Sequence, residues 1–232
     1  MITTIGATLL LGLILGVQHA LDADHVVAVS TIVSRERKPL GAAAAGLFWG
    51  IGHTITLLLV GIFVLVFKKT IPVRAALSME FLVGALLVGL GIQILWDCWR
   101  KSFHTHSHSP GRKHIHFHAH NQDHHHRERH RRKSLLVGMI HGLAGGGALV
   151  LLVLATIHTL LEGVAYILVF GVGSILGMMV ISTVLGLPFT LSAKWSGNLN
   201  ERIRLLAGAV SVVLGVLVMV QIGRLGGLLS VA

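Results

Sequence analysis

Six apolar runs, each long enough to cross a lipid bilayer, constrain the fold of this chain more than any other feature. A helix needs about 20 apolar residues to span the hydrocarbon core. Hydrophobic residues make up 53% of the 232 positions and charged residues only 12%, whereas soluble domains carry about 25% charged residues. The sequence therefore predicts an all-α, multi-pass protein of the inner or plasma membrane, in contact with the lipid bilayer. We expect the transmembrane helices at 4–33, 41–67, 79–99, 135–157, 163–190 and 203–223.

A long polar segment divides the six spans into two sets of three. We predict a first three-helix repeat at 1–99, a His-rich loop at 100–134 and a second three-helix repeat at 135–232. Because each repeat has an odd number of spans, the two repeats would insert with opposite orientations. Inverted repeats of this kind are typical of secondary transporters, whose substrate site lies near the membrane midplane at the repeat interface.

The repeat is visible in two aligned stretches. "GVQHALDADHVVAV" aligns without gaps onto "GMIHGLAGGGALVL", so that His19 falls on His141. About thirty residues later, "GIGHTI" aligns with "GVGSIL" at nearly the same offset, and His53 falls on Ser174. The two stretches align at nearly the same offset, about 121–122 residues. This agreement favours a true repeat over chance similarity between Gly-rich apolar helices.

The basic residues predict an orientation in the membrane. The loops after the first, third and fifth spans hold fifteen of the nineteen Lys and Arg residues, and the chain has a formal net charge of +10. Because Lys and Arg accumulate on the cytoplasmic side, we expect the His-rich loop in the cytoplasm and both termini outside. These positive charges lie in loops between spans, which argues against nucleic acid as a partner.

Four ionisable residues interrupt the first span in the stretch "HALDADH", namely His19, Asp22, Asp24 and His25. An Asp at the centre of a membrane helix costs about 2.5–3.5 kcal/mol, so such residues indicate a functional site. His19 and Asp22, three apart, share a helix face. Asp24 is rotated by about 160° from Asp22 on a regular helix. Either the helix unwinds at the motif, or Asp24 acts as a neighbouring group rather than as a ligand.

Two further histidines extend the candidate site. His53 lies in the second span within "FWGIGHT", and His141 lies in the fourth at the position that matches His19. Imidazole nitrogen combined with carboxylate oxygen suits divalent Ni, Co, Zn, Cu or Fe, so ligand type alone leaves the metal open. The only cysteine, Cys98, excludes an intrachain disulfide framework and any cysteine-based metal or redox motif.

The polar loop is loaded with histidine. Alternating His in a low-complexity segment is typical of metal binding, and the segment has too few apolar residues to fold around, which predicts no fixed site. The loop would bind several divalent ions and serve in sensing, buffering or delivery. Its histidines are His104, His106, His108, His114, His116, His118, His120, His124, His125, His126 and His130.

These motifs resemble those of the nickel/cobalt transporter family (NiCoT/NicO). That family has a first-helix signature of His, four residues and Asp-His, which "HALDADH" reproduces with His19, Asp24 and His25. Its second signature, Gly-His-Ser/Thr in the next helix, is similar to "FWGIGHT" around His53. "GMIHGLAGGGALVLL" resembles the urease-accessory nickel-permease branch. The resemblance implies Ni²⁺ or Co²⁺ as the substrate and cytoplasmic nickel chaperones of urease or hydrogenase assembly as partners.

We therefore expect a secondary transporter or facilitator that takes up Ni²⁺ or Co²⁺, with no enzymatic activity and no prosthetic group. The sequence contains no "GxxxxGK[ST]" phosphate loop, so this chain does not itself hydrolyse ATP. The residues assigned to the ion are His19, Asp22, Asp24, His25, His53 and His141.

Three alternatives remain open. Proton-coupled efflux of Ni²⁺ or Co²⁺ uses the same ligands in the opposite direction, and the His-rich loop is also similar to those of efflux members. A His-box membrane metalloenzyme would need several HxxxH boxes at one membrane face, although only five histidines lie outside the loop. A metal-sensing membrane protein would bind metal without flux.

Overall fold

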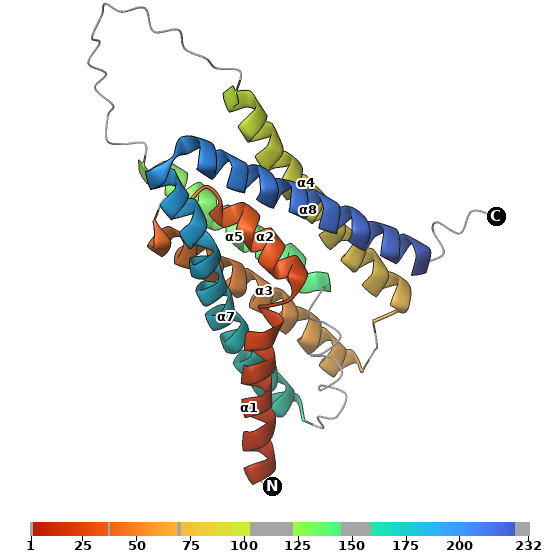
Figure 1. The fold of residues 1–232 in the computed structure, drawn as a ribbon. Helices are drawn as coiled ribbons and strands as arrows, with labels where there is room; N and C mark the ends of the chain where they lie inside the picture. The colour runs from red at the N-terminus through yellow and green to blue at the C-terminus, as the bar shows by residue number, and fades with distance from the viewer. Residues whose placement is uncertain (1, 37, 69–70, 103–122, 145–158, 226–232) are drawn as a thin grey trace, which may run out of the picture.

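The structure is a computed structural model that describes residues 2–36, 38–68, 71–102, 123–144 and 159–225 (Figure 1). Within these ranges the chain is all-helical, as predicted. The helices are α1 (Ile2–His19), α2 (Ala23–Val33), α3 (Pro39–Phe67), α4 (Val73–Ser102), α5 (Asp123–Ala144), α7 (Leu160–Trp195) and α8 (Gly197–Leu225).

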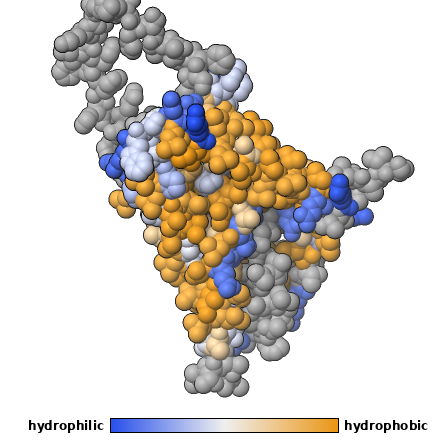
Figure 2. Space-filling view, viewed as in Figure 1, coloured by the Kyte–Doolittle hydropathy of each residue, from blue (hydrophilic) through white to orange (hydrophobic). Residues whose placement is uncertain are grey.

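Four of the described helices, α3, α4, α7 and α8, are long and apolar enough to cross a membrane. α1 and α2 qualify together as a fifth span that bends by 56° at the break between them. The predicted span at 135–157 is described only as far as Ala144, so the sixth span remains a prediction. Figure 2 shows apolar side chains over most of the visible face of these helices, which suits a surface in contact with lipid.

The helices pack through closely approaching backbones. α3 lies along α7 and α5, α1 lies along α7, and α4 lies along α8 (Figure 1). A Cβ atom on Gly16 of α1 would overlap the carbonyl of Phe170 on α7, and one on Gly138 of α5 would overlap the carbonyl of Trp49 on α3. Small residues allow helices in lipid to approach in this way, where dispersion contacts rather than water exclusion hold them together.

One end of the bundle, hereafter the loop end, is where α2, α4 and α7 end and α3, α5 and α8 begin. Charged side chains connect the helices there. Arg35 after α2 pairs with Asp97 of α4, and Glu36 lies 3.6 Å from His130 of α5, measured from Oε1 to Nδ1. The two pairs tie the end of the broken first span to α4 and α5.

The start of α5 differs from the prediction. α5 begins at Asp123, whereas the polar loop was expected to continue to residue 134. The prediction followed hydropathy, which marks only the apolar part of a helix. The added turns are rich in Arg, Glu and Lys, which form helices well in water, and the Asp at their start suits the positive end of the helix dipole.

Candidate metal-binding site

The first span is broken within the "HALDADH" motif. α1 ends at His19 and α2 begins at Ala23. Asp22 has the extended dihedrals φ −58° and ψ 142°, and its carbonyl accepts the first bond of α2 from the amide of Val26 at 3.0 Å. Non-helical backbone at membrane depth is tolerated where protein surrounds it. Of the two alternatives that the spacing left open, the structure shows the unwound helix.

Four fully buried imidazoles converge at this break from four helices. His19 comes from α1, His25 from α2, His53 from α3 and His141 from α5, and each is at most 2% exposed. The ring centroid of His25 lies 4.4 Å from that of His141, 4.5 Å from that of His19 and 5.2 Å from that of His53. With Asp22 and Asp24, these residues form what we call the His–Asp cluster.

The cluster contains two overlapping triads. His19, His25 and His53 form one, and Asp24, His25 and His141 form the other; within each triad the ligand atoms lie within 4.8 Å of one another. His25 belongs to both. Two triads of imidazole and carboxylate groups at this separation could each hold a divalent transition-metal ion.

Hydrogen bonds hold the ligands in place. The Nε2 atoms of His19 and His53 lie 3.1 Å apart. His141 donates from Nε2 to Oδ2 of Asp24 at 2.9 Å, and the Nδ1 atom of His25 lies 3.1 Å from Oδ1 of the same carboxylate. Asp24 thus bridges α2 and α5 with its two oxygens. An ion that binds here would replace these bonds and displace protons from the imidazoles.

Asp22 has a different position from Asp24. Its side chain is half exposed, and its Oδ2 atom accepts a bond of 2.7 Å from Nδ1 of His19. This bond places the lone pair of His19 on Nε2, the nitrogen that faces His53. Carboxylates that fix a ligating histidine in this way orient it and raise its basicity. The sequence left Asp22 open as a ligand or as an orienting group, and its geometry suits the second role.

Several cluster nitrogens are buried without a hydrogen-bond partner among the described residues. They are Nε2 of His25, Nδ1 of His53 and Nδ1 of His141. Buried polar atoms in folded proteins are nearly always bonded. Three unpartnered imidazole nitrogens in one buried cluster fit a cation ligand set better than a purely structural network.

Two aromatic walls of the cluster were missed by the sequence reasoning. Trp49 lies 5.4 Å from His141 between ring centroids, and Phe170 lies 5.6 Å from His19. Both side chains are fully buried. The repeat alignment contains the signal that could have found them, since an aromatic residue precedes Gly-x-Gly in "WGIGH" and in "FGVGS".

The His-rich segment is described only at its end. The histidines from His104 to His120 lie outside the described residues, and so do the glycines Gly145–Gly147 that follow His141. His124, His125 and His126 belong to α5. The side chain of His130 lies beside Glu36 at the loop end. Metal binding by the loop therefore remains a prediction.

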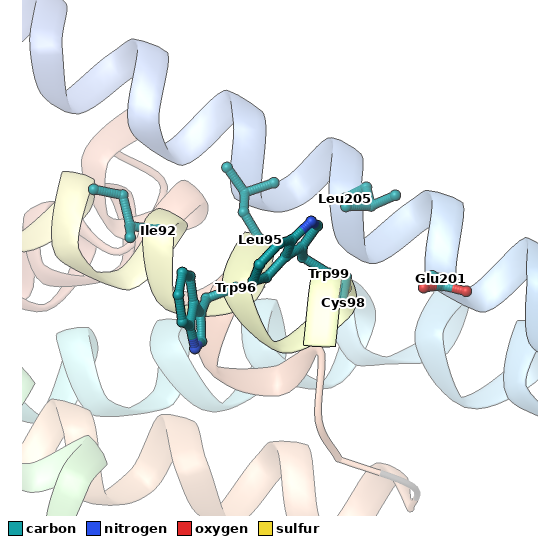
Figure 3. Close-up of a pocket in the computed structure, with 7 residues that line it drawn as sticks. All are labelled: Ile92, Leu95, Trp96, Cys98, Trp99, Glu201 and Leu205. Carbon is teal, nitrogen blue, oxygen red and sulfur yellow. The ribbon is translucent and has the colours of Figure 1, made fainter. Parts of the chain in front are cut away.

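A separate cavity of about 490 Å³ lies along the seam of α4 and α8, away from the cluster (Figure 3). It is lined by Ile92, Leu95, Trp96, Cys98, Trp99, Glu201 and Leu205. Its lining offers one carboxylate and the thiol of Cys98 but no imidazole, so it lacks the nitrogen ligands that the His–Asp cluster gathers.

Comparison with known proteins gives the family. Residues 6–217 match the family described as the cytochrome C biogenesis protein transmembrane region, and the chain belongs to this family. The chain is also 43% identical over 220 residues to the urease accessory protein UreH of Bacillus sp. (strain TB-90), covering 95% of this chain and 93% of that protein. No solved structure matches the chain significantly.

Proposed function

We propose that this member of the cytochrome C biogenesis transmembrane family is a nickel permease that takes up Ni²⁺, or Co²⁺, through the His–Asp cluster. The observation that carries the proposal is the convergence of four buried imidazoles and a carboxylate at a break in a membrane helix. The similarity to a urease accessory protein, together with the resemblance of the motifs to those of nickel/cobalt transporters, supports nickel as the substrate. Nickel is here the transported ion and not a resident cofactor.

The two triads suggest how the ion moves. In the first triad, His19, His53 and His25 would take the ion after it loses part of its water. His25 would then pass it to the second triad, where the carboxylate of Asp24 adds negative charge. The two ring nitrogens of His25 support this order. Its Nδ1 atom faces Asp24 of the second triad, and its unpartnered Nε2 atom is available to an ion held by the first triad.

The membrane potential is sufficient to drive uptake. A divalent cation gains about 4.6 kcal/mol per 100 mV on entering a negative interior. Import therefore needs no coupling ion, which agrees with the lack of a phosphate loop in the sequence. Export would have to overcome the same free energy and would require proton antiport, with the His–Asp bonds as candidate proton carriers.

An inverted repeat would place this site at the interface of the two halves. Reciprocal glycine contacts support it. A Cβ on Gly52 of α3 would overlap the carbonyl of Leu135 on α5, and a Cβ on Gly173 of α7 would overlap the carbonyl of Leu13 on α1. Leu13 corresponds to Leu135 at the offset of 122 that aligns His19 with His141, and Gly52 corresponds to Gly173 at the offset of 121 that aligns "GIGHTI" with "GVGSIL". With the loop end in the cytoplasm, as the basic residues predict, α1 would lead from outside to the cluster.

A second function to consider for this chain is thiol–disulfide exchange across the membrane, and the sequence argues against it. A dithiol relay needs two cysteines, and the only one, Cys98, is buried on α4. Proton-coupled efflux therefore remains the main competing function.

The test is ⁶³Ni²⁺ flux into proteoliposomes under an imposed negative-inside potential. We expect flux that follows the potential in the wild type and no flux in Asp24→Asn. Asp97→Asn, which makes the same change to a carboxylate at the loop end, is the matched control and should retain flux. Flux that appears only when a proton gradient is imposed would support the exporter. Wild-type flux in Asp24→Asn would contradict the proposed site.

A further inference from the structure

α7 presents two opposite faces with different chemistry. Side chains four residues apart face the interior and are fully buried: Tyr166, Phe170, Ser174, Met178 and Ser182. The side chains two positions further along the helix point outward, and each is 46–61% exposed: Leu168, Val172, Leu176, Val180 and Val184. We call the first set the hydroxyl face, because three of its five side chains carry a hydroxyl group. The outward set is entirely aliphatic and suits contact with lipid.

The three hydroxyl groups of this face have no hydrogen-bond partner among the described residues. Other hydroxyls on the same helix do: Thr183 donates to the carbonyl of Met179 at 2.7 Å, and Thr190 donates to that of Leu187 at 2.9 Å. A hydroxyl in a membrane helix normally bonds to its own backbone in this manner. Hydroxyl groups that are buried without such a bond are suited to another polar partner, such as water or a hydrated ion.

The hydroxyl face runs past the His–Asp cluster on both sides. Phe170 lies beside His19, so the cluster is level with the middle of the face. Tyr166 packs against Gly12 of α1 on the side of the N-terminus. Ser182 packs against Gly46 of α3 toward the loop end. At about 1.5 Å per residue the face extends about 24 Å, close to the thickness of the hydrocarbon core of about 30 Å.

We propose that the hydroxyl face of α7 lines the route by which the ion reaches the His–Asp cluster and leaves it. This inference rests on the proposed transport function. Hydroxyl oxygens along a route replace part of the hydration shell of a cation. In this structure the glycine contacts close the route, with α1 covering Tyr166 and α3 covering Ser182. Separation of α7 from α1 opens one side of the cluster, and separation of α7 from α3 opens the other.

Cysteine accessibility tests the route. Ser174→Cys and Ser182→Cys are each introduced into full-length protein that carries Cys98→Ser, and Val180→Cys on the aliphatic face is the matched control. In proteoliposomes under Ni²⁺ flux, a charged methanethiosulfonate reagent should modify the two route positions at least about tenfold faster than the control, because only a hydrated thiol ionises and reacts. Added Ni²⁺ at saturation should slow the modification of Ser174→Cys.

A second pair of variants tests the hydroxyl groups themselves. The double variant Ser174→Ala and Ser182→Ala should slow flux about tenfold with unchanged Ni²⁺ affinity, since it removes route oxygens but no cluster ligand. Val180→Ala is its control. If the parent protein transports Ni²⁺ but the route cysteines react no faster than Val180→Cys, or the double variant transports at the wild-type rate, this inference is overturned and the proposed function stands. Absence of flux in the Cys98→Ser parent would contradict the proposed function as well.

Discussion

The first span and α5 carry matching sequences, "GVQHAL" and "GMIHGL", but the first span breaks directly after its histidine whereas α5 stays helical as far as it is described, to Ala144. α1 ends at His19, whereas α5 continues through His141 to Ala144. The residues that follow differ. Asp22 stands directly before the new helix α2, and Asp24 lies in its first turn. Acidic residues are favoured at both places, because they complement the positive end of the helix dipole.

The comparison shows how one half of the protein builds a site and the other completes it. The break bends the chain by 56°, so that His25 of α2 meets His19 of α1 from a second direction. α5 adds the imidazole of His141, which donates to Asp24. The two segments with matching sequences thus differ at the residues that form the cluster.

The largest expected effect is that of His25→Ala. His25 is the only residue shared by the two triads, so its loss should abolish high-affinity Ni²⁺ binding and flux while leaving membrane insertion intact. Equilibrium dialysis with ⁶³Ni²⁺ on protein purified in detergent measures the affinity. Protein that elutes as the wild type does on size exclusion but binds nickel normally would contradict the shared-ligand account.

His53→Ala and His141→Ala should each have a smaller effect, one that differs between Ni²⁺ binding and Ni²⁺ flux. Each removes a ligand from one triad and leaves the other complete. We expect each variant to keep one mode of Ni²⁺ binding but to lose net flux, because the ion cannot pass between triads. Binding titrations and flux assays on the same preparations separate the two readouts. Complete loss of binding in both variants would indicate one merged site instead.

Asp22→Asn should weaken Ni²⁺ affinity but leave the number of residues that bind the ion unchanged. The carboxylate holds Nδ1 of His19 at 2.7 Å, and loss of such an orienting partner typically reduces metal affinity or activity 10–100-fold. Asp22→Glu is the conservative control and should restore part of the affinity. A variant Asp22→Asn that loses all bound nickel would instead make Asp22 a direct ligand.

The smallest expected effects are changes in thermal stability. They test whether the Gly52 and Gly173 contacts are equivalent, as the predicted repeat requires. Gly52→Ala and Gly173→Ala should lower the thermal stability of the protein in detergent by similar amounts, because each added methyl group meets a backbone carbonyl. Gly89→Ala is the control, since nothing lies within 4 Å of a Cβ there, and it should stabilise α4 by about 0.5–1 kcal/mol. Strongly unequal losses at the two sites would argue against equivalent contacts.

Much of the helical organisation could be predicted from the sequence. Long apolar runs locate α3, α4, α7 and α8 because only intramolecular hydrogen bonds satisfy a backbone in lipid. The ionisable residues of "HALDADH" indicated a site because such groups are costly in a membrane. The six-span count and the inverted repeat stay predictions, since residues 145–158 lie outside the described ranges.

The detailed roles within the cluster could not be predicted from spacing. The spacing placed Asp22 beside His19, but the turn of Asp24 toward His141 depends on how α5 approaches α2, and no local pattern encodes that approach. Trp49 and Phe170 occupy aligned positions in the two stretches, but the alignment does not say that they pack on the cluster histidines. Helix spacing predicts which residues share a face, but tertiary packing decides which partner each one meets.

The most direct test of the account is the coordination of nickel in the purified protein. In a variant with all eleven loop histidines replaced by Ala, X-ray absorption at the nickel edge should show a nitrogen and oxygen shell with imidazole scattering. His25→Ala in the same background should leave no bound nickel. Equal nickel occupancy with an unchanged spectrum in His25→Ala would contradict the claim that the break in the first span gathers the ligands of the transported ion.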